Sequence, residues 1–111
     1  MLKTLVNLGF KQQEAEVYLF LVLNGPKRAK YIADALETYK RKVYRALKNL
    51  QNLKIASATQ TLPAEFYAIS FEKVLDLFMK AAMEQAKTLQ VSKKKLLSTW
   101  RSMNEKDSSN S

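Results

Sequence analysis

The chain has 111 residues, and its 19 Lys and Arg against 10 Asp and Glu give a net charge of +9, with no cysteine and no histidine. This length predicts one small domain with an appended helix or tail, and no segment has the pattern of a membrane span or a signal peptide. Without cysteine and histidine the chain lacks disulfides, thiolate metal sites and the commonest general base, so we expect no enzyme, no metal site and no cofactor.

Three helices are predicted in the first third of the chain, over residues 1–8, 11–23 and 28–36, where apolar residues recur at helical spacing. Gly9 interrupts the first, and Asn24-Gly25-Pro26 ends the second, because glycine suits a left-handed helix end and proline cannot continue a helix. The apolar residues at this spacing are Leu2, Leu5, Val6, Leu8, Ala15, Tyr18, Leu19, Val22 and Leu23. In the third helix, Ala29, Ile32, Ala33 and Leu36 are predicted to face inward.

A fourth helix is predicted from Thr38, its N-cap, to about Leu53. Its buried stripe consists of Val43, Ala46, Leu47 and Leu50, and cations occupy much of the remaining circumference. We predict that Tyr18, Tyr31 and Tyr44 lie in the core or at its edge rather than in a functional site.

Two short segments after this helix, residues 54–61 and 65–69, are predicted to be the strands of a β-hairpin. Leu62-Pro63-Ala64 between them fits the turn, because proline cannot donate a hydrogen bond to a strand ladder.

A long final helix is predicted from Ser70 onward. Its apolar stripe, interrupted at Lys93, consists of Leu75, Phe78, Ala82, Ala86, Leu89, Leu96, Trp100 and Met103. So small a domain cannot bury this stripe, so we predict a dimer interface formed by Leu75, Phe78, Ala82, Leu89, Leu96 and Trp100. The alternative is a break near Ser92 that folds the last turns back onto the domain.

The predicted fold is therefore mainly α with a small β-hairpin: a winged helix-turn-helix with a long C-terminal helix. Residues 1–70 form the winged helix-turn-helix domain, residues 71–104 the dimerisation helix, and the polar residues 105–111 a disordered tail. In this fold the third and fourth helices make the helix-turn-helix, and the fourth enters the major groove of DNA.

The stretches "LGFKQQEAEVYLFLVLNGPKRAKYIADAL", "RKVYRALKNL" and "FYAISFEKVLDLF" resemble the TrmB-like family of archaeal winged-helix transcription regulators. This resemblance ends at Phe78 and implies a DNA-binding domain without the sugar-binding effector domain of larger members. Many members carry glycine at the turn before the recognition helix and before the first wing strand, where this chain has Glu37 and Lys54. The family's wing is usually basic, whereas "SATQTLPAE" contains no cation.

Between Lys27 and Lys54 there are nine Lys and Arg but only two Asp and Glu, which indicates a polyanionic partner. We expect Arg41 and Arg45 to approach bases, because arginine can bond guanine bidentately, while Tyr39, Lys40 and Lys42 hold the DNA backbone. The full set of candidate DNA-binding residues is Lys27, Arg28, Lys30, Thr38, Tyr39, Lys40, Arg41, Lys42, Arg45 and Lys48.

The predicted function is sequence-preferring binding of double-stranded DNA by a homodimeric, cytoplasmic and nucleoid-associated transcription regulator, without a small-molecule effector. The recognition helix spans about residues 38–53. One alternative is a non-specific architectural protein of chromatin. The other is a winged-helix module that binds proteins of the transcription machinery, which the uncharged wing favours.

Overall fold

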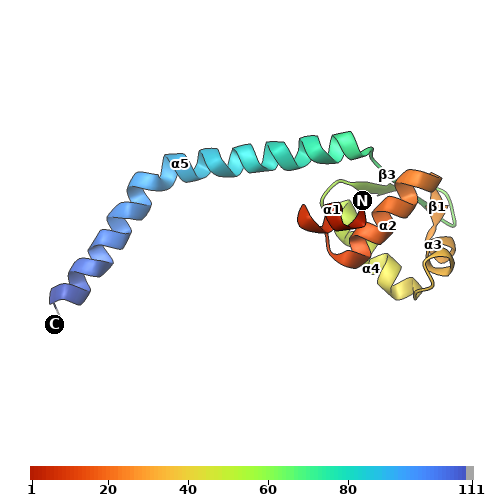
Figure 1. The fold of residues 1–111 in the computed structure, drawn as a ribbon, viewed down its shortest axis with the longest axis horizontal. Helices are drawn as coiled ribbons and strands as arrows, with labels where there is room; N and C mark the ends of the chain where they lie inside the picture. The colour runs from red at the N-terminus through yellow and green to blue at the C-terminus, as the bar shows by residue number, and fades with distance from the viewer. Residues whose placement is uncertain (110–111) are drawn as a thin grey trace. The chain divides into compact units, whose positions relative to one another are not determined.

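The computed structural model describes residues 1–109, with side chains described up to Asn104. The elements are α1 (Leu2–Asn7), α2 (Gln12–Asn24), β1 (Lys27–Arg28), α3 (Ala29–Ala35), α4 (Lys40–Asn52), β2 (Ala56–Ala58), β3 (Glu65–Ala68) and α5 (Phe71–Ser109) (Figure 1). The chain divides into two compact units, the first from Met1 to Val74 and the second from Leu75 onward. The mainly helical fold class is confirmed.

The sheet has three antiparallel strands in the order β1-β3-β2, so the predicted hairpin is present and a third strand joins it. In β1, Lys27 pairs with Phe66 and Arg28 with Glu65 across β3. This strand was missed, and the third helix therefore begins at Ala29 rather than at residue 28. Because β1 has only two residues, it has no periodicity of its own and is defined by its partner strand.

The fourth helix begins later than predicted: its N-cap is Tyr39, and Thr38 makes no side-chain cap. Thr38 belongs instead to the turn that ends α3, where its N–H donates to the carbonyl of Ala33 at 2.9 Å. In the same turn the N–H of Glu37 donates to the carbonyl of Asp34 at 3.3 Å. These two hydrogen bonds form a Schellman motif, which ends a helix. A threonine beside a helix end is also the signal for an N-cap, so the sequence did not distinguish the end of α3 from the start of α4.

The same C-terminal motif ends α1 and α4. Its left-handed residue is Gly9, with φ of 115°, after α1, and Lys54, with φ of 64°, after α4; Glu37 has φ of 53° after α3. After α4, the N–H of Lys54 donates to Gln51 and that of Ile55 to Leu50, each at 2.9 Å. Both positions at which the family carries glycine thus have backbone angles that favour glycine in this chain.

The core of the first unit lies between α2, α4 and the sheet, and Tyr18 is its largest fully buried side chain. Tyr18 donates a 2.9 Å hydrogen bond from its hydroxyl to the carbonyl of Ile69, the residue just beyond β3. The buried apolar residues are Leu5, Phe10, Ala15, Val17, Tyr18, Leu21, Ala29, Ile32, Ala33, Val43, Ala46, Leu47, Leu50, Ile55, Ala56, Phe66 and Val74. The predicted stripe of the fourth helix is therefore correct in full.

Helical spacing alone did not identify the buried residues of α2. Leu23 is 74% exposed, while Val17 and Leu21 of the same helix are buried. Residues 17–23 are apolar at every position, so the periodicity of this segment did not identify its inward face. Tyr31 and Tyr44 lie at the edge of the core, as predicted: each is more than half exposed, but their rings pack against Phe20 and Phe66.

The second unit is one continuous helix through Ser92, without the alternative break at that residue. The helix runs to Ser109, beyond the expected start of the tail at residue 105, and residues 110–111 lie outside the described part of the chain. No helix within residues 1–109 is long and apolar enough to cross a membrane. Among the side chains that the structure describes, up to Asn104, no group of three His, Cys, Asp or Glu residues could bind a metal ion.

Candidate nucleic-acid interface

The exposed face of α4 is a row of three cations. Arg41, Arg45 and Lys48 follow one another at four- and three-residue spacing, opposite the stripe that contains Val43 and Leu47. All three side chains are exposed. Because α4 contacts the rest of the domain through the opposite side, this row is the part of the helix that a groove of DNA could meet first.

The wing is the hairpin formed by β2, β3 and the loop between them. On one side of the cation row, α4 faces this wing. A pocket of about 190 Å³ there is lined by Arg28, Ala29, Lys30, Lys40, Tyr44, Pro63 and Ala64. The Tyr44 ring meets the Phe66 ring edge-on, with centroids 6.1 Å apart, so it spans from α4 to the sheet. Three predicted cations from β1, α3 and α4 therefore lie around one tyrosine and the uncharged tip of the wing.

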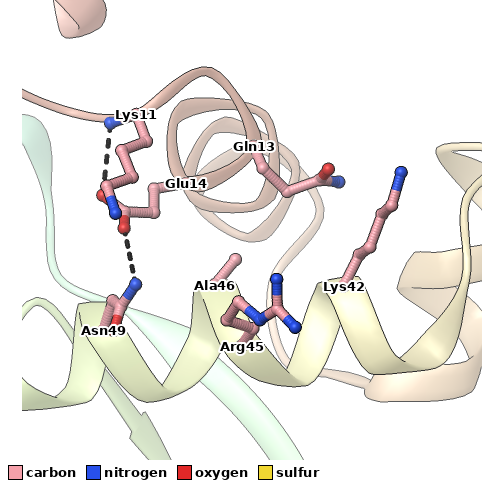
Figure 2. Close-up of a pocket in the computed structure, with 7 residues that line it drawn as sticks. All are labelled: Lys11, Gln13, Glu14, Lys42, Arg45, Ala46 and Asn49. Carbon is pink, nitrogen blue, oxygen red and sulfur yellow. Dashed lines mark hydrogen bonds between the residues drawn. The ribbon is translucent and has the colours of Figure 1, made fainter.

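On the other side of the row, α4 faces the start of α2. A second pocket of about 260 Å³ is lined by Lys11, Gln13, Glu14, Lys42, Arg45, Ala46 and Asn49 (Figure 2). Asn49 donates a 2.9 Å hydrogen bond from its amide to the Glu14 carboxylate, which is only 7% exposed. Figure 2 shows Lys42 and Arg45 on the α4 side of this pocket and Gln13 on the α2 side.

Exposed tyrosines accompany two of the cations. The Lys27 ammonium lies 5.4 Å from the centroid of Tyr31, and the Lys42 ammonium lies 5.8 Å from that of Tyr39. The Tyr31 ring also packs against Phe20, with centroids 6.2 Å apart. At such distances the ring face attracts the cation, which limits how far each lysine swings into solvent.

Seven of the ten predicted DNA-binding residues thus fall into three places. Arg28, Lys30 and Lys40 meet beside the wing, Lys42 and Arg45 line the pocket near α2, and Arg41 and Lys48 stand on the outward row. Lys27 and Thr38 are half-buried, the former in β1 and the latter in the turn after α3. All of them except Thr38 contribute a cation or, at Tyr39, an exposed ring.

Sequence reasoning missed Lys11 and Gln13, which lie about thirty residues before Lys42 and Arg45 in the chain but share a pocket with them. It also missed Tyr44 and Pro63 beside the wing. No local pattern marks these residues, because tertiary packing alone brings them to α4. Of the predicted dimer positions, Leu89, Leu96 and Trp100 are each more than half exposed, Ala82 is exposed, and Leu75 and Phe78 are half-buried.

Comparison with known proteins identifies structures that are similar to this chain. The Zalpha domain from Carassius auratus PKZ, solved in complex with Z-DNA, is 29% identical, with a TM-score of 0.50 over 52% of this chain and 94% of that chain. The ST1889 protein from Sulfolobus tokodaii is 20% identical, with a TM-score of 0.63 over 78% and 96%. A possible transcriptional regulator from Methanosarcina mazei Go1 is 15% identical, with a TM-score of 0.65 over 81% and 82%.

The two archaeal proteins show that this chain shares their fold. At such low sequence identity, the similarity gives no information about function. A search of curated proteins found no match. The family model described as "Sugar-specific transcriptional regulator TrmB" matches residues 5–72, more than half of the chain. The chain therefore belongs to the TrmB family of transcriptional regulators, and the resemblance seen in its sequence is confirmed.

Proposed function

We propose that the chain binds double-stranded DNA with a sequence preference, as a homodimeric regulator that inserts α4 into the major groove. The observation that carries this proposal is the outward row of Arg41, Arg45 and Lys48 on α4, with cation-lined pockets on both sides. A helix that presents cations across its whole free face matches a groove whose two walls are phosphate backbones.

In this proposal the row and its two sides have different roles. Arg41 and Arg45 reach base edges, because they lie on the side of α4 opposite the packed stripe and a guanidinium can bond guanine O6 and N7 together. The cations beside the wing contact the phosphates of one strand, and Lys42 with Lys11 contacts those of the other. Thr38 and Tyr39, which directly precede α4, support the contacts to the DNA backbone. The uncharged wing leaves α4 as the main reader.

The proposed dimer forms through α5 and presents two copies of α4 to one face of the duplex. Successive major grooves on one face are about 34 Å apart, so the preferred site is an inverted repeat with half-sites one helical turn apart. We propose regulation without a small-molecule effector, and the proposed DNA binding implies a nucleoid-associated location in the cytoplasm.

Selection from a random duplex library, performed with the full chain, tests this function. The expected result is enrichment of one inverted repeat, bound about 10³-fold or more tightly than random duplex. Binding with a steep salt dependence but no enriched sequence would replace this proposal with the architectural function. Absence of duplex binding, combined with capture of a component of the transcription machinery, would replace it with the protein-interaction function.

One further duplex belongs in that experiment. Because the similar domain from Carassius auratus was solved with Z-DNA, an alternating CG duplex held in the left-handed form by bromination or methylation is compared with the same sequence in the right-handed form. We expect the right-handed form to bind at least as tightly. A clear preference for the left-handed duplex would overturn the assignment of α4 to the major groove.

A further inference from the structure

Seven of the eight apolar positions in the α5 stripe are arranged symmetrically about Leu89, and the exception is Ala86, whose counterpart is Ser92. Ala82 and Leu96 lie seven residues to either side of it, Phe78 and Trp100 lie eleven, and Leu75 and Met103 lie fourteen. At about 100° per residue, these offsets keep all seven positions within roughly 40° of one line along the helix. The stripe therefore presents apolar side chains at the same intervals when it is followed from either end.

The second half of this stripe is open to solvent in the described chain. Leu89 is 62% exposed, Leu96 54%, Trp100 59% and Met103 56%. An aligned set of large apolar side chains this exposed usually marks an interface. A second copy of the chain is the occupant that carries the same intervals, which a two-fold axis at Leu89 would bring into register.

Side-chain size distinguishes the two ways of pairing such helices. In a parallel pair in register, each residue meets itself, so Ala82 meets Ala82 and Trp100 meets Trp100. In an antiparallel pair centred on Leu89, Ala82 of one copy meets Leu96 of the second copy. A small residue opposite a large one fills the space between helices more evenly, so the antiparallel pair packs with fewer voids.

Charge favours the same arrangement. Lys93 lies on the stripe itself, four residues after Leu89, and a parallel pair would place two Lys93 side chains against each other. The antiparallel pair places Lys93 opposite Gln85, which lies four residues before Leu89 and can accept a hydrogen bond from the ammonium. A lysine within a coiled-coil seam of this kind selects the arrangement of the helices at some cost in stability.

The remaining charges of α5 are divided by Leu89. Before Leu89, Glu72, Asp76 and Glu84 are balanced by Lys73, Lys80 and Lys87, whereas Lys93, Lys94, Lys95 and Arg101 follow Leu89 with no acidic residue until Glu105. A parallel pair would align the two basic halves along their whole length. An antiparallel pair aligns each basic half with the half that contains the carboxylates, which reduces the repulsion.

We propose that two copies of α5 pack antiparallel about a two-fold axis at Leu89, and that Lys93 selects this orientation. This inference rests on the homodimer of the proposed function and adds its geometry. With a rise of about 1.5 Å per residue, the two Leu75 residues, at which the second unit begins in each copy, lie about 42 Å apart along the pair. The α5 pair thus sets the separation between the two points where the DNA-binding units are attached.

Cysteine cross-linking in the full chain tests the orientation, because the natural sequence has no cysteine. Chains with Ala82→Cys and chains with Leu96→Cys are oxidised separately and as a mixture. In the antiparallel pair, two copies of position 82 lie about 21 Å apart, beyond disulfide reach. We therefore expect little cross-linking in either single variant and a disulfide-linked heterodimer in the mixture, whereas a parallel pair would cross-link each single variant with itself.

Two further variants complete the experiment. Leu89→Cys lies on the proposed axis and should cross-link with itself, while Lys87→Cys, on the opposite side of the helix, should not. Efficient self-linking of both Ala82→Cys and Leu96→Cys would overturn the antiparallel arrangement, but it would be consistent with a parallel dimer. A monomer in sedimentation equilibrium at micromolar concentration would overturn the pairing altogether. Both measurements are made without DNA, so neither depends on the assignment of α4.

Discussion

The amide of Asn49 in α4 donates a 2.9 Å hydrogen bond to the Glu14 carboxylate in α2. Glu14 is the one charged side chain counted among the buried residues of the described chain, and its other oxygen accepts the Lys11 N–H at 3.2 Å. The same carboxylate thus caps the start of α2 and fixes the position of α4 beside it. Since α4 carries the outward row of cations, this contact links the packing of the domain to the placement of the candidate interface.

Replacement of Asn49 by alanine should destabilise the first unit. The change leaves one oxygen of a buried carboxylate without a partner, and we expect the free energy of unfolding to fall by about 1–3 kcal/mol. Asn49→Asp should cost more, because it places a second carboxylate beside Glu14. Urea denaturation followed by circular dichroism measures both changes.

Asn52→Ala is the matched control for this pair, because Asn52 is exposed near the end of the same helix. The control accounts for the gain in helix propensity that alanine brings, about half a kcal/mol. Equal stability of Asn49→Ala and Asn52→Ala would show that the bond between Asn49 and Glu14 contributes nothing to folding.

Arg41 and Lys40 are neighbours on α4 and should respond differently to substitution. Arg41→Ala should cost about 1–3 kcal/mol on the selected site and much less on random duplex, since it removes contacts to bases. Lys40→Ala should weaken both duplexes alike and lower the slope of log K against log salt by about one. Fluorescence anisotropy at several salt concentrations separates these results.

The assignment of Arg41 as a reader of bases depends on the difference between duplexes. If Arg41→Ala weakens the selected and random duplexes equally, Arg41 contacts phosphate. If neither Arg41→Ala nor Arg45→Ala changes duplex affinity, α4 is not the DNA-binding element. That result would favour the alternative function, in which the chain binds proteins of the transcription machinery.

The helices of this fold could be predicted from the sequence because their stripes are regular and their ends carry strong signals. The stripe from Val43 to Leu50 is separated from the cations by face, so one periodicity fixes both the buried and the exposed side. For α4, this periodicity was enough to predict most of the residues of the candidate interface. The order of the segments then gave the helix-turn-helix.

What the sequence could not predict depends on contacts between distant segments. Strand β1 has two residues and exists through its pairing with β3. The burial of Glu14 requires Asn49, which lies 35 residues away in the chain. Lys11 joins the candidate interface for the same reason, since the packing of α2 on α4 brings it to Arg45. Local propensity contains none of this information.

Lys54 occupies a left-handed position, with φ of 64°, at the end of α4. A side chain in this conformation costs about 1–2 kcal/mol, and glycine avoids that cost while losing more entropy on folding. We therefore expect Lys54→Gly to raise the free energy of unfolding by about 0.5–1 kcal/mol. Thermal and urea denaturation should agree on the sign of this change.

Lys54→Ala removes the same charge but keeps the Cβ atom, so we expect no gain in stability from it. Glu37→Gly, at the corresponding position after α3, should behave as Lys54→Gly does. A loss of stability in both glycine variants would mean that the Glu37 and Lys54 side chains make contributions larger than the backbone strain.

Tyr18 should make the stability of the first unit depend on pH in the alkaline range. Its side chain is 1% exposed, and burial raises the pKa of its phenol above the ordinary value of 10.0. A raised pKa means that the folded state holds the proton more tightly than the unfolded state does. The protonated Tyr18 phenol therefore contributes its full share of the free energy of unfolding below pH 10. This stabilisation is lost as the pH rises toward the folded pKa, because the phenol ionises at a lower pH in the unfolded chain than in the folded one.

Comparison of Tyr18→Phe with the natural chain isolates the contribution of the Tyr18 phenol to the pH dependence of stability. At neutral pH the variant should lose about 1–2 kcal/mol, because the carbonyl of Ile69 loses its donor. Between pH 10 and pH 11 the difference should shrink by up to about 1.4 kcal/mol per pH unit, since the variant has no phenol to ionise. Tyr67→Phe, at an exposed position of β3, should keep the natural pH dependence. Parallel curves for the natural chain and Tyr18→Phe up to pH 11 would show that the buried phenol does not couple proton release to unfolding.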